Sequence, residues 1–247
     1  MRRILILGGT GDASKLATRA SELEGIEVIT SLAGRTRQPS TPVGTVRIGG
    51  FGGETGLANY LRDTGIELLI DATHPFAAQI SFNAAAAATA CGLPRLMLVR
   101  PAWQPACGDR WIEVESVEAA AATLRGQAKR VFLTIGRQQL TAFADLDELW
   151  FLMRLIDPPE LGALVPEGML LFERGPFSLA EERQLLRQHA IDAVVSKNSG
   201  GEATYAKIVA ARELGLKVVM VKRPAVPPGE QVANVDNALA WLVSWLG

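Results

Sequence analysis

Short apolar runs alternate with helical patterns along the chain, and this alternation constrains the fold more than any other feature. Strands separated by helices are typical of βαβ units, whose strands form a parallel sheet. We predict strands at 4–7, 27–32, 45–48, 67–71 and 95–99, then at 111–114, 131–134, 149–155, 169–172, 193–196 and 218–221. Helices are predicted at 12–23, 54–64, 75–91, 116–125, 178–189, 203–214 and 235–246. The expected fold class is α/β, with two open parallel sheets of similar size.

A proline-containing segment without periodicity separates the two series of strands. It spans 100–109 and reads RPAWQPACGD, which is typical of a connection between domains. We therefore predict one domain over 1–100 and a second over 101–247. Ligands of open parallel sheets bind beyond the carboxyl ends of the strands, at the point where the strand order reverses.

Composition and charge exclude several classes of function. The formal net charge of −1 argues against binding to nucleic acids or anionic membranes. No apolar run reaches the roughly 18 residues of a membrane span. Cys91 and Cys107 suggest neither a disulfide framework nor a metal site, so a reducing cytoplasm is expected. The sequence contains no P-loop, no G-x-S-x-G nucleophile elbow and no metal-ligand spacing, and we predict no metal.

A glycine-rich turn follows the first predicted strand and leads into the first helix. Its residues Gly8, Gly9, Thr10, Gly11 and Asp12 stand where a dinucleotide-binding turn holds a pyrophosphate against helix N–H groups. The fingerprint is imperfect, because Ser14 occupies the place of the third glycine. The alternative is a tight turn in which Asp12 caps the helix. The position after an N-terminal strand favours nucleotide binding.

The end of the second strand predicts which dinucleotide binds. NAD-binding folds place an acidic residue there for the ribose 2′-hydroxyl, and a basic residue accommodates a 2′-phosphate. This chain has no acidic residue at that place. It has Arg35, Thr36 and Arg37 there instead. We predict NADP rather than NAD. The alternative is a solvated basic loop.

Two further loops follow predicted strands of the first series, at the same edge of the sheet as the glycine-rich turn. Residues 49–53 read GGFGG, which suggests a backbone that approaches a ligand, and we assign Gly50 and Gly52 to the cofactor. A flexible turn is the competing interpretation. Residues 71–76 read DATHPF, in which Thr73 is assigned to the cofactor and His74 either caps a helix or contacts a ligand.

Cations stand at the ends of four strands of the second series, three just after the strand and Arg154 near the end of 149–155. They are Arg137, Arg154, Arg174 and Lys197. The carboxyl ends of parallel strands meet at one edge, and like charges brought together favour an anionic ligand. We expect a small ligand with several carboxylates or phosphates, held also by Ser199 and Gly200. Each cation taken singly is explained equally well as a solvated surface charge.

Several motifs together resemble the precorrin-6A reductase family over nearly the whole chain. The most distinctive are DATHPFA at 71–77 and SKNSGG at 196–201, accompanied by ILGGT at 6–10, AGRT at 33–36, GGFG at 49–52 and AARELG at 210–215. The resemblance implies two Rossmann-like domains with the ligands between them, 1–100 binding NADP and 101–247 binding substrate. It also implies NADPH-dependent reduction of a double bond in precorrin-6A or its cobalt form, on the route to vitamin B12, with other corrin-pathway enzymes as partners.

The resemblance agrees with the residues on three points. NADPH fits the Arg35 loop, a tetrapyrrole with many carboxylates fits the cations, and hydride transfer needs neither metal nor nucleophile. His74 is a candidate proton donor, although water or a substrate carboxyl is favoured. Two alternatives stay open: an NADPH-dependent reductase of another polyanion, and a non-catalytic protein that senses NADP(H). A sensor would bind the dinucleotide without oxidising it.

Overall fold

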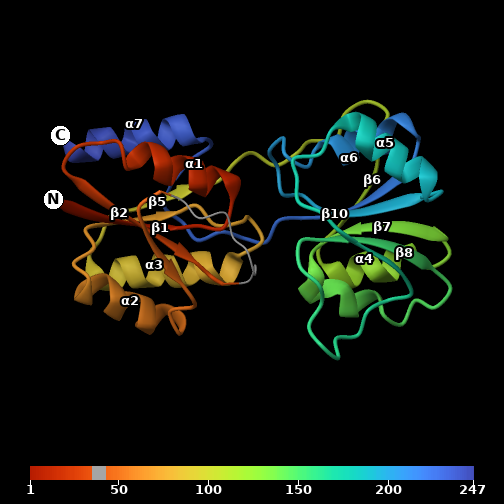
Figure 1. Cartoon of the computed structure of the whole chain (residues 1–247), viewed down its shortest axis with the longest axis horizontal. Helices are drawn as coiled ribbons and strands as arrows, with labels where there is room; N and C mark the ends of the chain where they lie inside the picture. The colour runs from red at the N-terminus through yellow and green to blue at the C-terminus, as the bar shows by residue number, and fades with distance from the viewer. Residues whose placement is uncertain (35–42) are drawn as a thin grey trace. The chain divides into compact units, whose positions relative to one another are not determined.

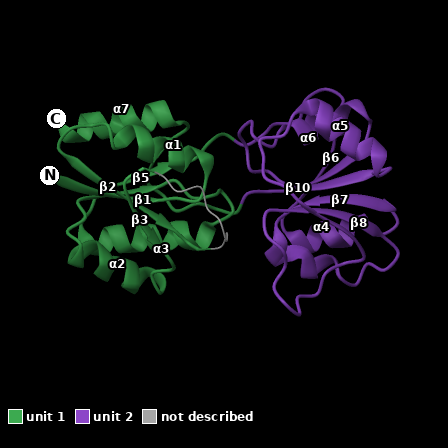
Figure 2. Ribbon diagram, in the orientation of Figure 1, with its two compact units in different colours: residues 1–101, 224–247 green, residues 102–223 purple. Residues whose placement is uncertain are grey.

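The computed structural model describes residues 1–34 and 43–247, which divide into two compact units (Figure 2). Unit 1 consists of Met1–Pro101 and Pro224–Gly247, and unit 2 of Ala102–Arg223. Each unit contains one six-stranded sheet in which all neighbouring strands are parallel. The predicted α/β class with two parallel sheets is confirmed.

The sheet of unit 1 has the order β12-β5-β4-β1-β2-β3. Its strands are β1 (Arg2–Leu7), β2 (Ile26–Leu32), β3 (Thr45–Ile48), β4 (Leu68–Asp71), β5 (Arg95–Leu98) and β12 (Glu230–Val232). Helices α1 (Gly11–Ala20) and α7 (Val235–Leu246) cover one face, and α2 (Gly53–Asp63) and α3 (Ala78–Cys91) cover the other (Figure 1). The strands are apolar on both faces because each face is buried under helices.

The sheet of unit 2 has the order β6-β11-β10-β7-β8-β9. Its strands are β6 (Arg110–Val114), β7 (Arg130–Thr134), β8 (Trp150–Leu155), β9 (Gly168–Phe172), β10 (Ala193–Lys197) and β11 (Lys217–Val221). Helices α5 (Leu179–Gln188) and α6 (Ala206–Glu213) lie on one face, and α4 (Val117–Leu124) lies on the other (Figure 1). A 3₁₀ helix, η1 (Arg137–Phe143), follows β7 and was not predicted.

Both sheets reverse their strand order at an equivalent place. The reversal lies between β1 and β4 in unit 1 and between β7 and β10 in unit 2. A threonine hydroxyl joins the two strands or their loops at each reversal: Thr10 Oγ1 donates to Ala72 O at 2.9 Å, and Thr134 Oγ1 donates to Val195 O at 3.0 Å. Ligands of such open sheets bind beyond the carboxyl ends of the strands, at this reversal of the strand order.

The division of the chain differs from the predicted boundary at 100/101. Residues 224–247 return to unit 1, because β12 pairs with β5 and because Ala238, Leu239 and Leu242 of α7 are buried in the core of that unit. The short strand β12 was missed because it holds only three residues and no apolar run. Helix α3 begins at Ala78 instead of residue 75, since the Ala77 N–H donates to His74 O at 2.7 Å and closes a turn before the helix.

Candidate functional site

The glycine-rich turn joins β1 to α1 at the strand-order reversal of unit 1. Thr10 caps α1, with its Oγ1 accepting the Ala13 N–H at 3.0 Å while donating to Ala72 O. The cap is therefore Thr10 and not Asp12, as the tight-turn alternative had supposed. Asp12 lies in the first helical turn and pairs with Arg100, whose Nη1 is 3.0 Å from Oδ2. The first N–H groups of α1 have no partners within the helix and face the end of the sheet.

Two glycines near this edge are required neither by backbone conformation nor by packing. Gly11 and Gly50 have no positive φ, and a Cβ added to either would meet no atom within 4 Å. By contrast, a Cβ on Gly8 would lie 3.1 Å from Thr30 Cγ2, so packing of β1 against β2 explains that glycine. A glycine in unstrained, open surroundings indicates a backbone that another molecule approaches closely.

A cavity of about 250 Å³ lies at the carboxyl ends of β1 to β4. Its walls include four of the predicted cofactor residues: Gly8, Gly50, Gly52 and Thr73. The other walls come mainly from the ends of β2 and α3 and from the 49–53 loop: Leu7, Ser31, Ala33, Gly49, Phe51, Gly53, Leu57, Ile80 and Asn83. Gly9 and Thr10 lie on the β1–α1 turn that continues from Gly8, and Gly11 and Asp12 are the first two residues of α1. Arg35, Thr36 and Arg37 fall outside the described residues.

Arg47, a residue that the sequence argument missed, fastens the 49–53 loop. Its Nη1 donates to Gly49 O at 2.5 Å and its Nη2 donates to Gly50 O at 2.8 Å. The guanidinium carbon lies 3.8 Å from the centre of the Phe51 ring and 5.2 Å from that of Tyr60. The only sequence signal was an arginine two residues before a glycine run that contains an aromatic residue.

The loop after β4 is ordered by its own side chains. Asp71 is buried and its Oδ1 accepts the Thr73 N–H at 3.1 Å and the Thr73 hydroxyl at 2.7 Å. His74 Nδ1 accepts the Phe76 N–H at 3.2 Å, so the proton of the neutral ring is on Nε2. Burial lowers the pKa of Arg95 on the neighbouring strand, and the charge of Asp71 partly offsets that effect.

In unit 2, the four predicted cations lie at or near the carboxyl ends of adjacent parallel strands: Arg154 and Lys197 within the last two residues of β8 and β10, and Arg137 and Arg174 just after β7 and β9. The strands run side by side in the order β10, β7, β8, β9, and they bring Lys197, Arg137, Arg154 and Arg174 to one edge of the sheet. Arg137 and Lys197 flank the strand-order reversal. The Arg137 Nη1 donates to Pro158 O at 3.0 Å, and Arg174 is exposed.

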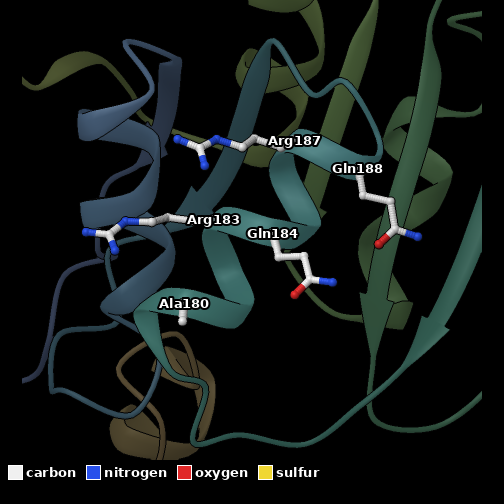
Figure 3. A pocket seen from close by; sticks show the side chains of 5 residues that line it. All are labelled: Ala180, Arg183, Gln184, Arg187 and Gln188. Carbon is white, nitrogen blue, oxygen red and sulfur yellow. The ribbon is translucent and has the colours of Figure 1, made fainter.

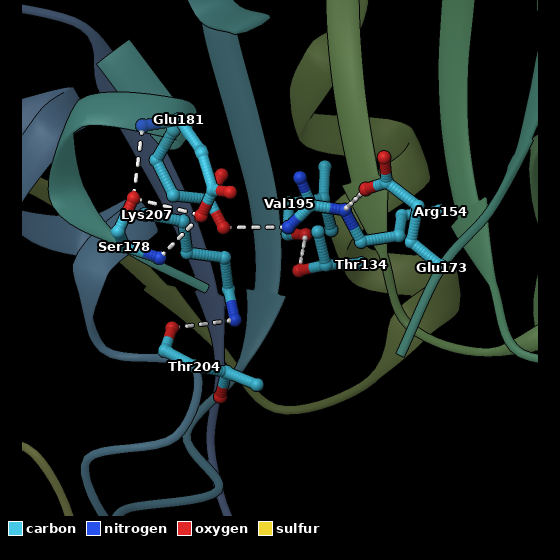
Figure 4. Close-up of polar contacts among 9 residues, drawn as sticks. Thr134, Arg154, Glu173, Ser178, Glu181, Val195, Thr204 and Lys207 are labelled. Atoms are coloured by element: carbon cyan, nitrogen blue, oxygen red, sulfur yellow. Dashed lines mark hydrogen bonds and ion pairs between the residues drawn. The ribbon is translucent and has the colours of Figure 1, made fainter. Parts of the chain in front are cut away.

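Arg154 differs from the other three because its side chain is only 8% exposed. Its Nη1 lies 2.5 Å from Glu182 Oε1 and its Nε lies 3.2 Å from Glu173 Oε2 (Figure 4). Its guanidinium also stacks on Phe177, with the carbon 3.8 Å from the ring centre. Because its charge is satisfied within the protein, this placement speaks against the predicted direct contact between Arg154 and substrate.

The SKNSGG loop after β10 has a structural centre in Asn198, which is buried and bonded to the backbone of Trp103. The predicted ligand residues Lys197, Ser199 and Gly200 surround it. Ser199 N–H donates to Lys197 O at 2.7 Å, and Gly200 adopts a φ of +66°. The SKNSGG motif therefore combines a structural asparagine with a half-buried Lys197 and Ser199 and a buried Gly200.

Other candidate features lie away from the strand ends. A shallow hollow follows the outer side of α5 and is lined by Ala180, Arg183, Gln184, Arg187 and Gln188 (Figure 3). No group of three His, Cys, Asp or Glu side chains among the described residues is arranged to hold a metal ion. In the same part of the chain, no helix has the length and apolar character needed to cross a bilayer.

Comparisons with known proteins match almost the full length of the chain. The model of the precorrin-6x reductase CbiJ/CobK family matches residues 3–243. A precorrin-6A reductase of Rhodococcus erythropolis is 52% identical over 243 residues and covers 98% of both chains. A cobalt-precorrin-6A reductase of Priestia megaterium is 28% identical over 257 residues, also covering 98% of each. The solved structure of a CobK precorrin-6A reductase superposes with a TM-score of 0.93 at 43% identity, covering 99% of this chain and 97% of that one.

Proposed function

This chain belongs to the precorrin-6x reductase CbiJ/CobK family, and from that premise we propose which residues hold its cofactor and its substrate. The protein is an oxidoreductase that reduces a carbon–carbon double bond of precorrin-6A, a tetrapyrrole intermediate of cobalamin biosynthesis. A nicotinamide cofactor supplies the hydride when bound. A purely sensory role is set aside, because the relatives that match over the full length are reductases.

The cofactor is assigned to the carboxyl edge of unit 1. The observation that carries this proposal is that Gly11 and Gly50 stand in open surroundings with ordinary φ values, beside a cavity lined by Gly8, Gly52 and Thr73. The pyrophosphate is assigned to the Gly8–Gly11 turn, where the N–H groups of α1 and its positive helix end favour an anion. The glycines leave room for that approach, and Thr10 holds the turn in place.

The dinucleotide is proposed to be NADPH. At the end of β2 the chain supplies Arg35, Thr36 and Arg37 where an NAD enzyme has an acid. Arg47 on the adjacent strand adds a described cation at this corner, since its Nη1 lies 3.5 Å from the Ser31 hydroxyl. The absence of an acid removes the group that would repel a 2′-phosphate.

The substrate carboxylates are assigned to Arg137, Arg174 and Lys197, with Ser199 and Gly200 beside them. These residues follow β7, β9 and β10 at one sheet edge. Arginine binds carboxylates with a two-pronged donor set, which suits a macrocycle with carboxylates around its rim. The metal-free substrate is favoured, since relatives named for it are 44–52% identical, against 28–30% for those named for the cobalt form.

His74 is proposed as a substrate-binding donor instead of the proton source. The Phe76 N–H donates to Nδ1, so the proton of the neutral ring is on Nε2, and we assign this N–H to the binding of a substrate carboxylate. Protonating the ring would replace that bond with a repulsive contact between two donors. We assign the proton that joins the carbon adjacent to the hydride acceptor to water or to a substrate carboxyl.

The proposal is tested by the loss of reduced-nicotinamide absorbance with purified protein and precorrin-6A. We expect fast oxidation of NADPH and slow oxidation of NADH. Replacing Arg35 and Arg37 by alanine should raise the KM for NADPH about tenfold or more, because a single charged hydrogen bond to the 2′-phosphate already contributes about that much. The KM for NADH should not change. Equal use of both nucleotides by the unaltered protein would refute the NADPH assignment.

The substrate half is tested separately with Arg137→Ala and Lys197→Ala. Each should raise the KM for precorrin-6A while the Kd for NADPH stays the same, because the two sets of residues lie on different units. An unchanged KM for precorrin-6A in both variants would contradict the proposed role of these cations.

A further inference from the structure

Unit 2 contains a cluster of buried charges that the proposed ligand contacts do not use. The Arg154 side chain is 8% exposed, Glu182 is fully buried, and Lys207 is 5% exposed. Buried charges carry a large desolvation penalty, and well-packed apolar residues of similar size are often equally stable or more so. Three charged side chains in one core therefore call for an explanation beyond the stability of the fold.

Arg154 fixes the loop that follows β9 from two sides. Its Nε lies 3.2 Å from Glu173 Oε2 (Figure 4). Its guanidinium carbon lies 3.8 Å from the centre of the Phe177 ring. Arg174 lies between these two contact points in the chain. The end of the loop is fixed as well, because Ser178 and Glu181 form a reciprocal capping box at the start of α5 (Figure 4).

Lys207 fixes the loop that follows β10. Its Nζ donates to Thr204 O at 3.1 Å (Figure 4) and lies 5.3 Å from the centre of the Trp103 ring. Thr204 belongs to the same connection between β10 and α6 as Ser199 and Gly200. Burial lowers the pKa of Lys207 to about 8, while the charge of Glu182 raises it, so Lys207 remains mostly protonated at neutral pH.

The two loops also contact each other directly above this cluster. The Phe177 N–H donates to Ala203 O at 3.3 Å, and a Cβ on Gly175 would lie 3.2 Å from the same oxygen. Glu182 links Arg154 to Lys207. Its Oε1 pairs with Arg154, and its negative charge raises the pKa of Lys207. Its Oε2 has no hydrogen-bond partner among the described residues. A displacement of Arg154 or Lys207 would therefore affect both loops.

We infer that Arg154, Glu182 and Lys207 are positioning residues that hold the Arg174 and Ser199–Gly200 loops in the conformation that binds the substrate's carboxylates. This inference rests on the proposed substrate role of those loops. None of the three residues needs to contact the substrate. Arg154 was predicted from the sequence to contact the substrate. It acts instead on Arg174, by holding Glu173 and Phe177 on either side of that residue in the chain.

The test compares kinetics of Arg154→Lys, Arg154→Met and Lys207→Met. Arg154→Lys keeps a positive charge next to Glu182, so it should fold, but it loses the flat guanidinium that stacks on Phe177. We expect the KM for precorrin-6A to rise about tenfold in Arg154→Met and Lys207→Met, and less in Arg154→Lys. The KM for NADPH should not change, because the cofactor residues belong to unit 1.

Two control variants separate positioning from general loss of stability. Leu124→Ala creates a cavity in the core of the same unit, under α4, and should lower the melting temperature without changing the KM for precorrin-6A. Arg183→Met changes the residue that follows Glu182 on α5. The Arg183 side chain lies on the outer side of the helix (Figure 3) and pairs with Glu213. This variant should leave both KM values unchanged.

Limited digestion with trypsin provides a readout independent of activity. Cleavage after Arg174 should accelerate in the Arg154 variants and not in Leu124→Ala, because only the former release that loop. If Arg174→Ala raises the KM for precorrin-6A but the Arg154 and Lys207 variants behave like Leu124→Ala, the positioning role is refuted and the proposed function stands. If Arg137→Ala, Arg174→Ala and Lys197→Ala all leave that KM unchanged, the substrate assignment itself fails.

Discussion

Asn198 holds the backbone of Trp103 with both ends of its side-chain amide. Its Oδ1 accepts the Trp103 N–H at 2.8 Å, and its Nδ2 donates to Trp103 O at 2.9 Å. The Trp103 indole N–H donates to Gly201 O at 2.8 Å. The start of unit 2 is thus attached to the turn after β10, and Asn198 satisfies two backbone groups that are otherwise buried without partners.

We predict that Asn198→Ala destabilises unit 2 by about 2–4 kcal/mol, because a buried N–H and a buried C=O both lose their partners. Denaturation by urea, followed by tryptophan fluorescence, measures the change. The matched control is Asn59→Ala on the exposed side of α2, which should change stability by less than about 0.5 kcal/mol. Equal effects of the two substitutions would show that the hydrogen bonds between Asn198 and the Trp103 backbone do not contribute to the free energy of unfolding.

A second prediction concerns Gly50. Gly50→Val should leave the free energy of unfolding nearly unchanged, since the residue has an ordinary φ and no atom lies within 4 Å of an added Cβ. The affinity for NADPH should fall about tenfold or more, because the side chain occupies space that the cofactor needs. Titration of the Kd by nucleotide fluorescence measures the effect.

Gly25→Ala is the complementary control for Gly50. Gly25 has a φ of +81° and lies in the connection between α1 and β2, away from the cavity. A side chain there should cost about 1 kcal/mol of stability without changing the Kd for NADPH. If Gly50→Val lost stability and kept its affinity, the open space at that position would not belong to the cofactor.

The sequence predicted the sheets well because buried parallel strands are short apolar runs between helices. It also placed Arg137, Arg174 and Lys197 at one edge, since the carboxyl ends of parallel strands meet there. It could not distinguish Arg154 from them, because that difference depends on Glu182, which is 28 residues further along the chain. The cap at Thr10 and the role of Arg47 depend likewise on contacts with other loops.

A third prediction concerns Arg47, which holds the 49–53 loop through two carbonyl oxygens and a stacked ring. Arg47→Lys keeps the charge but has neither the planar fork nor the stacking surface. We expect the Kd for NADPH to rise about tenfold and stability to fall by about 1 kcal/mol. Arg62→Lys serves as control, since Arg62 is exposed on α2 and donates to Ala90 O at 3.0 Å. Unchanged NADPH binding in Arg47→Lys would show that the loop keeps its conformation without the arginine.

The last prediction concerns the pH dependence of stability. Burial lowers the pKa of Lys207 from its ordinary value of 10.5 to about 8 in the folded protein. Between these two values the unfolded chain binds a proton that the folded protein does not, so the free energy of unfolding should increase with pH across this window. Below pH 8 both states are protonated, and this residue contributes no slope. The full difference is about 3 kcal/mol.

Comparison of the wild type with Lys207→Met isolates this contribution from other groups that titrate above pH 8. The free energy of unfolding of both proteins is measured in urea at a series of pH values. From pH 8 to pH 10.5, the value for the wild type should rise relative to that for Lys207→Met. Lys222→Met is the control, because the hydrogen bond to Glu115 raises the pKa of this exposed lysine above 10.5, so its contribution falls only above pH 10.5 and should not change between pH 8 and pH 10.5. A difference between wild type and Lys207→Met that stays constant over this range would mean that Lys207 titrates normally, and therefore that water reaches its ammonium group in the folded protein.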